Sequence, residues 1–305
     1  MASMSRRHLV QGAAVLAGAA LAPACSSSGK AGGDAGSPAF DPEAARRGRL
    51  KQSLTDWPYV KHLGGMDGLC KTARDLGCVS VELCGPKDWP TLRKYGLVCA
   101  ITGSHGFVKG FNDPANHEMC VAKIREAADA CAANPGICPN VITFTGFRNG
   151  IPDDVGKKNC VNGLKKVISY CEEKKVNLCL EMLNSRVAED MKGHPGYQGD
   201  HMDYCIDIVR QVGSPRMKVL FDFYHVQVMD GDLLVRLRQY MPYVGHIHTA
   251  GVPGRCEIGP NQEINYRPLF QALADLKYDG YVGHEFVPTR DALDGLKEAV
   301  ALATV

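Results

Sequence analysis

The chain has 305 residues, and 45% of them are hydrophobic, which is enough apolar sequence to bury one full core. Lysine and arginine total 35 and aspartate and glutamate total 33, so the formal net charge is +2. This near balance leaves no electrostatic footprint for nucleic acid, and no heptad pattern indicates a coiled coil. The composition therefore argues against a nucleic-acid partner and is compatible with an enzyme or a small-molecule binding protein.

The first 24 residues have the pattern of a twin-arginine signal peptide. Arg6 and Arg7 precede a mildly apolar run, residues 10–24, which is too short and too weakly apolar for a comfortable transmembrane helix. Ala22-Pro23-Ala24 supplies the small residues of a cleavage site. We expect export by the twin-arginine route to the periplasm or cell envelope.

Residues 25–45 are expected to form a flexible tether, because residues 26–37 are rich in Ser, Gly and Ala and lack apolar periodicity. Cys25 follows Leu21-Ala-Pro-Ala, which resembles a lipobox with one extra residue. Cys25 is therefore a candidate for lipidation and membrane anchoring, and an incidental cysteine after a plain signal peptide is the alternative.

From residue 46 onward, strand-like and helix-like segments alternate with short connections. The predicted strands are residues 50–54, 79–83, 98–101, 141–144, 176–181, 219–223, 243–248 and 281–285. Helical spacing of apolar residues occurs at 119–130, 161–171, 204–212, 233–240 and 269–276. Eight such units over about 255 residues are typical of a (β/α)8 barrel. An open doubly wound sheet is disfavoured, because no Gly-rich phosphate motif follows the first strand. We predict an α/β fold with a single TIM barrel over residues 46–305.

Four polar side chains close successive predicted strands of the C-terminal half: Glu181, Asp222, His248 and Glu285. The active sites of such barrels lie at the carboxyl ends of the strands, so these side chains should converge. Carboxylate oxygens and an imidazole nitrogen suit Mn²⁺ or Mg²⁺, with Co²⁺ and Zn²⁺ as alternatives. A single strand-end glutamate is usually a solvated terminus, but that explanation does not account for four equivalent positions. The pattern predicts a divalent-metal site.

The cysteine count agrees with export. There are thirteen cysteines, and if Cys25 carries lipid, the remaining twelve are able to pair fully. Cys131 and Cys138 are the best local candidates for a disulfide. Others lie in apolar runs and could equally be buried thiols, namely Cys84, Cys99, Cys171 and Cys179. The sequence lacks CxxC spacing, which excludes a zinc ribbon.

Four stretches carry a family resemblance: Lys51–Trp57, His246–Arg255, Glu263–Tyr266 and Tyr278–Glu285. They resemble the hydroxypyruvate isomerase family, which belongs to the xylose-isomerase-like barrels together with ketose 3-epimerases and inosose dehydratases. The similarity extends over roughly residues 46–305.

The resemblance implies that Glu181, Asp222, His248 and Glu285 bind the metal and that the two glutamates act as acid and base. Some hydroxypyruvate isomerases have glutamine where this chain has His248, whereas the epimerases have histidine, so the substrate stays open. A metal that polarises a carbonyl and its neighbouring hydroxyl makes the α proton acidic and stabilises an enediolate. Proton return at the adjacent carbon is isomerisation, and return on the opposite face is epimerisation.

Three further residues are predicted to bind substrate. The resemblance places a substrate-contacting histidine at His225. The fork of Arg255 suits a substrate carboxylate or hydroxyl, and an arginine on a surface loop is the alternative. Trp57, with Phe107, is expected to form an apolar wall, although core packing explains both residues equally well.

Four more polar residues are weaker candidates. Glu263 belongs to a motif that could simply hold a loop over the site. His246 shares a strand face with His248 and is as compatible with barrel packing as with metal binding. His194 and His201 follow the fifth predicted strand and could approach the site from a loop.

These features favour a metal-dependent isomerase or epimerase of a small hydroxy-keto compound, either hydroxypyruvate-like or a ketose. A dehydratase of a keto-sugar or keto-inositol and a non-catalytic carbohydrate-binding lipoprotein are the alternatives. An abasic-site endonuclease of the same superfamily requires further His and Glu ligands and DNA. Because hydroxypyruvate is cytoplasmic, export favours a periplasmic sugar. A homo-oligomer is compatible with the sequence.

Overall fold

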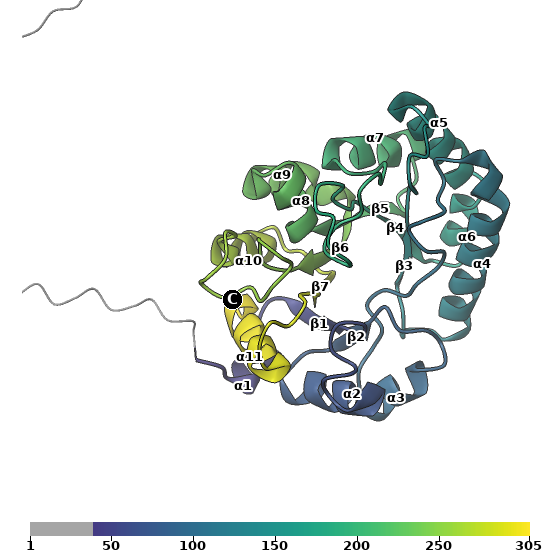
Figure 1. Cartoon of the computed structure of the whole chain (residues 1–305). Coiled ribbons are helices and arrows are strands. Elements are labelled where there is room, and N and C mark those ends of the chain that lie inside the picture. Colours follow the sequence, from purple (N-terminus) through teal and green to yellow (C-terminus); the bar gives the residue numbers. More distant parts are fainter. Residues whose placement is uncertain (1–38) are drawn as a thin grey trace, which may run out of the picture. The chain divides into compact units, whose positions relative to one another are not determined.

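The computed structural model describes residues 39–305 (Figure 1). The predicted signal peptide, Cys25 and most of the predicted tether lie outside the described residues. Helix α1 (Pro42–Arg47) begins at Asp41, whose side chain accepts a hydrogen bond from the Glu43 backbone N–H at 2.9 Å. Part of the segment that we expected to be tether up to residue 45 is therefore helical. Within residues 39–305, no helix is long and apolar enough to span a bilayer.

Seven parallel strands form one sheet that curves into a ring in Figure 1. They are β1 (Lys51–Thr55), β2 (Ser80–Glu82), β3 (Asn140–Thr143), β4 (Asn177–Glu181), β5 (Met217–Asp222), β6 (Val244–Thr249) and β7 (Tyr281–His284). Their order in the sheet is β2-β1-β7-β6-β5-β4-β3, so consecutive strands are neighbours except β2 and β3, and β7 pairs with β1. This arrangement confirms the predicted TIM-barrel-like α/β fold.

The predicted strand at residues 98–101 is not a regular strand, but the segment fills the eighth position of the ring. Single bridges join Val98 to Ser80 of β2 and Thr102 to Val141 of β3. Between these bridges, side chains replace part of the ladder: the Ala100 N–H donates to Ser80 Oγ at 2.8 Å, and Asn140 Nδ2 donates to the Ala100 carbonyl at 2.8 Å. Such side-chain substitution is not visible in hydrophobic periodicity, which explains the wrong assignment.

Helices surround the ring of strands (Figure 1). They are α2 (Gly65–Asp75), α3 (Trp89–Lys94), α4 (His117–Ala133), α5 (Asp153–Leu164), α6 (Ile168–Glu173), α7 (Met202–Val212), α8 (Phe223–Met229), α9 (Leu233–Tyr240), α10 (Tyr266–Asp275) and α11 (Ala292–Ala303), with short 3₁₀ turns η1 (Pro114–Asn116) and η2 (Met241–Tyr243). The helix predicted at residues 161–171 is divided between α5 and α6. At the division, the N–H groups of Lys166 and Val167 bond to carbonyls three residues back, which tightens the turn and ends the α-helix.

The core lies mainly between the outer face of the ring and the helices, and a smaller apolar cluster fills the inside of the ring. The inner cluster consists of Ile101, Ile142, Phe144, Cys179, Leu183, Tyr197 and Leu220. Strands β2 and β3 are buried along their whole length, as expected for a parallel sheet covered by helices.

The predicted disulfides are absent from the part of the chain that the structure describes. All twelve cysteines there are free thiols, and eleven of them are buried. Cys131 and Cys138 are unpaired, and the Cys138 thiol donates to the Asn140 carbonyl at 3.2 Å. These cysteines therefore act as small apolar side chains, which is the alternative that the sequence left open.

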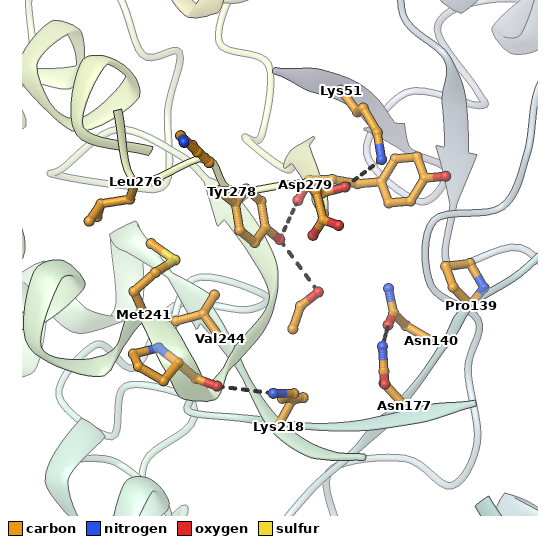
Figure 2. Close-up of a pocket in the computed structure, with 15 residues that line it drawn as sticks. Lys51, Pro139, Asn140, Asn177, Lys218, Met241, Val244, Leu276, Tyr278 and Asp279 are labelled. Atoms are coloured by element: carbon orange, nitrogen blue, oxygen red, sulfur yellow. Dashed lines mark hydrogen bonds between the residues drawn. The ribbon is translucent and has the colours of Figure 1, made fainter. Parts of the chain in front are cut away.

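A cavity of about 480 Å³ lies at the amino-terminal ends of the strands (Figure 2). Lys51 donates from its ammonium to the Asp279 carbonyl, and Lys218 donates to the Pro242 carbonyl at 3.0 Å. The Tyr278 hydroxyl donates to the Tyr281 carbonyl at 3.1 Å. These polar groups are thus bonded to backbone carbonyls, and the four predicted metal ligands lie at the opposite, carboxyl end of the strands.

We expect Asn140→Ala to lower the free energy of unfolding by about 1–3 kcal/mol, because it leaves the buried Ala100 carbonyl without its donor. Urea unfolding of the full chain measures this change, with substitution of the exposed Asn261 by alanine as the matched control. Equal, small effects of the two substitutions would show that the side-chain bond does not support closure of the ring.

Candidate active site

The four predicted strand-end side chains converge at the carboxyl end of the barrel. Glu181 and Asp222 are the last residues of β4 and β5, His248 is the penultimate residue of β6, and Glu285 directly follows β7. One donor atom from each lies within 4.8 Å of the donor atoms of the other three, and all four side chains are buried. Parallel strands bring their carboxyl ends to one edge, so residues more than one hundred positions apart meet here.

Arg255 supplies positive charge to this cluster. Its Nη2 donates to Glu285 and lies 3.5 Å from Asp222 Oδ2, while its Nη1 donates to the Met191 carbonyl at 2.7 Å. The remaining Nε–H is buried and has no hydrogen-bond partner within residues 39–305. Nη1 and Nη2 of Arg255 are thus already bonded to protein groups, and Nε is the guanidinium nitrogen that has no partner among these residues.

Glu285 is held in its ionised form. Burial opposes ionisation, but the charges of Arg255 and His248 outweigh it and lower the pKa of Glu285. Trp57 adds a hydrogen bond from its Nε1 to Glu285 Oε1 at 2.8 Å, and the Arg255 guanidinium lies 5.2 Å above the Trp57 ring. The residue expected to be an apolar wall therefore also anchors the carboxylate.

The negative charges of Glu181 and Asp222 are offset less by nearby positive charge than that of Glu285. Burial, reinforced by the charge of Glu285, raises the pKa of Glu181 to about 7 despite the neighbouring His248. Burial also raises the pKa of Asp222, although Arg255 opposes the shift. The site as it stands therefore lacks positive charge.

Two atoms of the cluster support a cation at this place. Asp222 Oδ2 and His248 Nδ1 are buried and lack hydrogen-bond partners among residues 39–305, although His248 Nδ1 is only 2.9 Å from Glu285 Oε2. The other oxygen of Asp222 accepts the Tyr224 N–H at 2.7 Å and caps α8. Unpartnered buried acceptors cost free energy that a bound cation would recover. The oxygen and nitrogen donors fit a divalent metal, without distinguishing Mn²⁺ from Mg²⁺.

His225 faces the same cluster as a neutral donor. Burial, followed by the charge of Arg255, lowers the pKa of His225 well below its usual value. The Asn184 backbone N–H donates to His225 Nδ1 at 3.0 Å, so the ring proton resides on Nε2. That nitrogen is buried, 3.6 Å from Asp222 Oδ2, and unpartnered among the described residues. The sequence analysis did not predict a role for Asn184, because no local sequence pattern distinguishes it.

A cavity of about 310 Å³ opens above the cluster. Its walls are mainly apolar: Trp57, Leu83, Phe107, Ile142, Phe144, Leu183 and Met191. Phe107 packs against His194 with ring centroids 4.3 Å apart, which brings both predicted residues to the cavity. Of the four clustered side chains, Glu181 and Glu285 line this cavity.

Three other candidates lie elsewhere. His201 is exposed and pairs with Asp230 at 2.5 Å, and Glu263 is exposed on its loop. His246 is buried inside the ring, with Nε2 2.9 Å from Glu82 Oε1. Within the motif of Glu263, Tyr266 has the structural role: its hydroxyl accepts the Ala250 N–H at 3.0 Å and donates to the Ala250 carbonyl at 2.7 Å.

Two residues that the sequence reasoning missed belong to this region. Glu82 ends β2 and contacts His248 Nε2 through its Oε1 at 2.8 Å. Burial opposes its ionisation, but the charge of His246 and hydrogen bonds from both histidines lower the pKa of Glu82. His105 lines the cavity and bonds through Nε2 to Thr143 Oγ1 at 2.9 Å. Glu82 is the penultimate residue of the predicted strand 79–83, near the strand end as the four clustered side chains are, and that position was the available signal.

Comparison with known proteins agrees with this geometry. Residues 70–303 match the family model described as xylose isomerase-like TIM barrel. The chain belongs to this family. A putative hydroxypyruvate isomerase of Mus musculus is 35% identical over 258 residues, which cover 83% of this chain and 85% of the relative. A 2-oxo-tetronate isomerase of Pectobacterium atrosepticum is 27% identical over 262 residues, covering 81% and 93% respectively.

Solved structures share the fold at greater distance. The crystal structure of an AP endonuclease, family 2, from Brucella melitensis superimposes with a TM-score of 0.69 and 22% identity, covering 81% of this chain and 97% of that one. This likeness shows the barrel alone. The homologues that are similar in sequence are isomerases, which confirms the enzyme class expected from the sequence.

We expect the metal-free protein to lose stability as the pH rises, because of Glu181. A pKa raised from 4.5 to about 7 means that the folded state binds this proton more tightly than the unfolded state. The resulting stabilisation is complete below pH 4.5 and is lost as the pH passes through 7. Glu181→Gln removes this loss. Between pH 5 and pH 8, the free energy of unfolding of the variant should therefore rise relative to that of wild type by on the order of 1–3 kcal/mol.

Urea unfolding of the chelator-treated proteins at both pH values measures the difference, with Glu118→Gln on the exposed face of α4 as control. A difference between Glu181→Gln and wild type that does not change with pH would contradict the raised pKa.

Proposed function

We propose that the protein is a divalent-metal-dependent isomerase or epimerase of a small hydroxy-keto compound, acting through an enediolate. The observation that carries this proposal is the position of Glu181 and Glu285. They belong to the buried cluster of four donors and also line the cavity above it. Two carboxylates that reach both a cation and a substrate suit proton transfer to and from carbon.

The chain's own residues then have separate tasks. Asp222 and His248 would hold the cation from below, together with the two glutamates. A cation held there would polarise the carbonyl and hydroxyl oxygens of a bound substrate and make the neighbouring C–H acidic. One glutamate takes that proton, and the same or the other glutamate returns it. Return to the adjacent carbon gives isomerisation, and return to the opposite face gives epimerisation.

Two donors would stabilise the negative charge that develops on substrate oxygen. His225 Nε2–H and Arg255 Nε–H are both buried and unpartnered within residues 39–305. Neither group has to break an existing hydrogen bond before it donates to a ligand, so both are preorganised for this purpose. Trp57 and Phe107 give the cavity apolar walls.

The size of the cavity and the homologues narrow the substrate class. A volume of about 310 Å³ is at the lower end of ligand sites. The named substrates of the two relatives, hydroxypyruvate and 2-oxo-tetronate, are small keto acids. Because Nη1 and Nη2 of Arg255 already bond to Met191 and Glu285, its unpartnered Nε supports one contact to a hydroxyl or carboxylate oxygen rather than a two-point clamp. We infer a hydroxy-keto acid or a ketose of similar size.

We further propose that the enzyme is exported through the twin-arginine route and that Cys25 is a candidate lipid anchor. This proposal rests on the Arg6-Arg7 pattern and the small residues before Cys25. Export would give the enzyme access to keto-sugars outside the cytoplasm.

We expect the Mn²⁺-loaded protein in D₂O to incorporate deuterium at the carbon next to the carbonyl of its substrate, tested with hydroxypyruvate, 2-oxo-tetronate and a panel of ketoses. Glu181→Gln and Glu285→Gln should each reduce exchange by about 10²–10⁴-fold, because each removes one proton-transferring carboxylate. Mass spectrometry and proton NMR of the recovered substrate measure the exchange.

The exposed Glu118→Gln variant is the control and should exchange like wild type. Undiminished exchange in either active-site variant would remove that glutamate from catalysis. Absence of exchange in wild type with every compound would refute the enediolate mechanism.

A further inference from the structure

Beneath the four clustered side chains lies a second buried group, formed by Glu82, His246 and His248. Glu82 Oε1 is 2.9 Å from His246 Nε2 and 2.8 Å from His248 Nε2. All three side chains are fully buried inside the ring. Neither the family match nor the predicted ligand set assigns a role to Glu82.

The direction of these hydrogen bonds follows from the chemistry of the groups. An ionised carboxylate accepts and cannot donate, so both imidazoles donate from Nε2. A metal-binding imidazole is neutral, so with the proton on Nε2 the lone pair of His248 would be on Nδ1, which is the nitrogen 3.6 Å from Glu181 Oε1 and 2.9 Å from Glu285 Oε2. The bond to Glu82 thus orients the ring so that its free nitrogen faces the proposed cation.

The surroundings hold Glu82 in this position. His246 bonds to the same oxygen as His248. The two rings are nearly perpendicular, and their centroids are 4.9 Å apart. On β7, Gly283 pairs with His248, and a Cβ added at Gly283 would lie only 2.2 Å from Glu82 Oε1. The absence of a side chain at Gly283 therefore makes room for the carboxylate.

We propose that Glu82 is a positioning residue that fixes the orientation and protonated nitrogen of His248 for metal binding, with His246 holding Glu82 in place. Carboxylate–histidine–metal arrangements of this type typically contribute 10–100-fold to metal affinity. The inference rests on the proposed metal-dependent function. A second cation among Glu82, His246 and His248 is disfavoured, because each Nε2 already donates its proton to Glu82.

Titration of the metal-free full chain with Mn²⁺ by calorimetry tests the proposal without an activity assay. Wild type should bind one Mn²⁺ per chain. Glu82→Gln, which fills nearly the same volume, and Glu82→Ala should both bind one Mn²⁺ with 10–100-fold lower affinity. Glu118→Gln should match wild type. Circular dichroism of the metal-free variants establishes that they are folded.

His246→Gln is the second variant and should weaken Mn²⁺ binding less than either Glu82 substitution, because His248 keeps its acceptor. Wild-type affinity in Glu82→Gln would overturn the positioning role and leave packing as the function of Glu82, while the proposed metal function would stand. Two Mn²⁺ per wild-type chain, with one lost in Glu82→Gln, would replace positioning by a second metal site. Absence of Mn²⁺ binding in wild type would refute both the metal-dependent function and this inference.

Discussion

Burial of three carboxylates in one small cluster is the constraint on which the rest of this structure depends. Glu181, Asp222 and Glu285 lie close together and out of water, where like charges repel strongly and each is poorly solvated. Arg255 and His248 offset part of that charge. Because Arg255 is used in this way, it has little capacity left to clamp a substrate. The remaining deficit of positive charge is what makes the cluster suitable for a divalent cation.

A cluster of this kind persists only if the backbone that carries it is held rigidly. Buried tyrosine hydroxyls bond to the backbone beside three of the four side chains. Tyr197 donates to the carbonyl of Glu181 at 2.9 Å, Tyr266 bonds to both backbone groups of Ala250 beyond His248, and Tyr59 accepts the N–H of Phe286 at 3.1 Å. Asp222 is fixed differently, by capping α8. These bonds keep the strand ends from moving apart under electrostatic repulsion.

Much of the fold could be predicted because it depends on local patterns. Apolar periodicity identified seven strands correctly, and their alternation with helices indicated the barrel. The prediction was wrong at residues 98–101 and 161–171. In the first segment, side chains of Ser80 and Asn140 replace strand pairing, and in the second, a shift to shorter-range backbone bonds divides the helix. Both deviations depend on contacts that local periodicity does not encode.

For the site, the sequence by itself determined which hard donors end the strands, since a parallel barrel places all strand ends at one edge. It therefore predicted Glu181, Asp222, His248 and Glu285 as a group. Only the tertiary structure decided which of them reach the cavity, how Arg255 divides its hydrogen bonds, and that Glu82 lies beneath His248. These relations depend on side-chain directions across the ring and on the space left by Gly283, which separate strands create together. Spacing along the chain determines neighbours within an element, whereas burial and pairing between elements arise only when the ring closes.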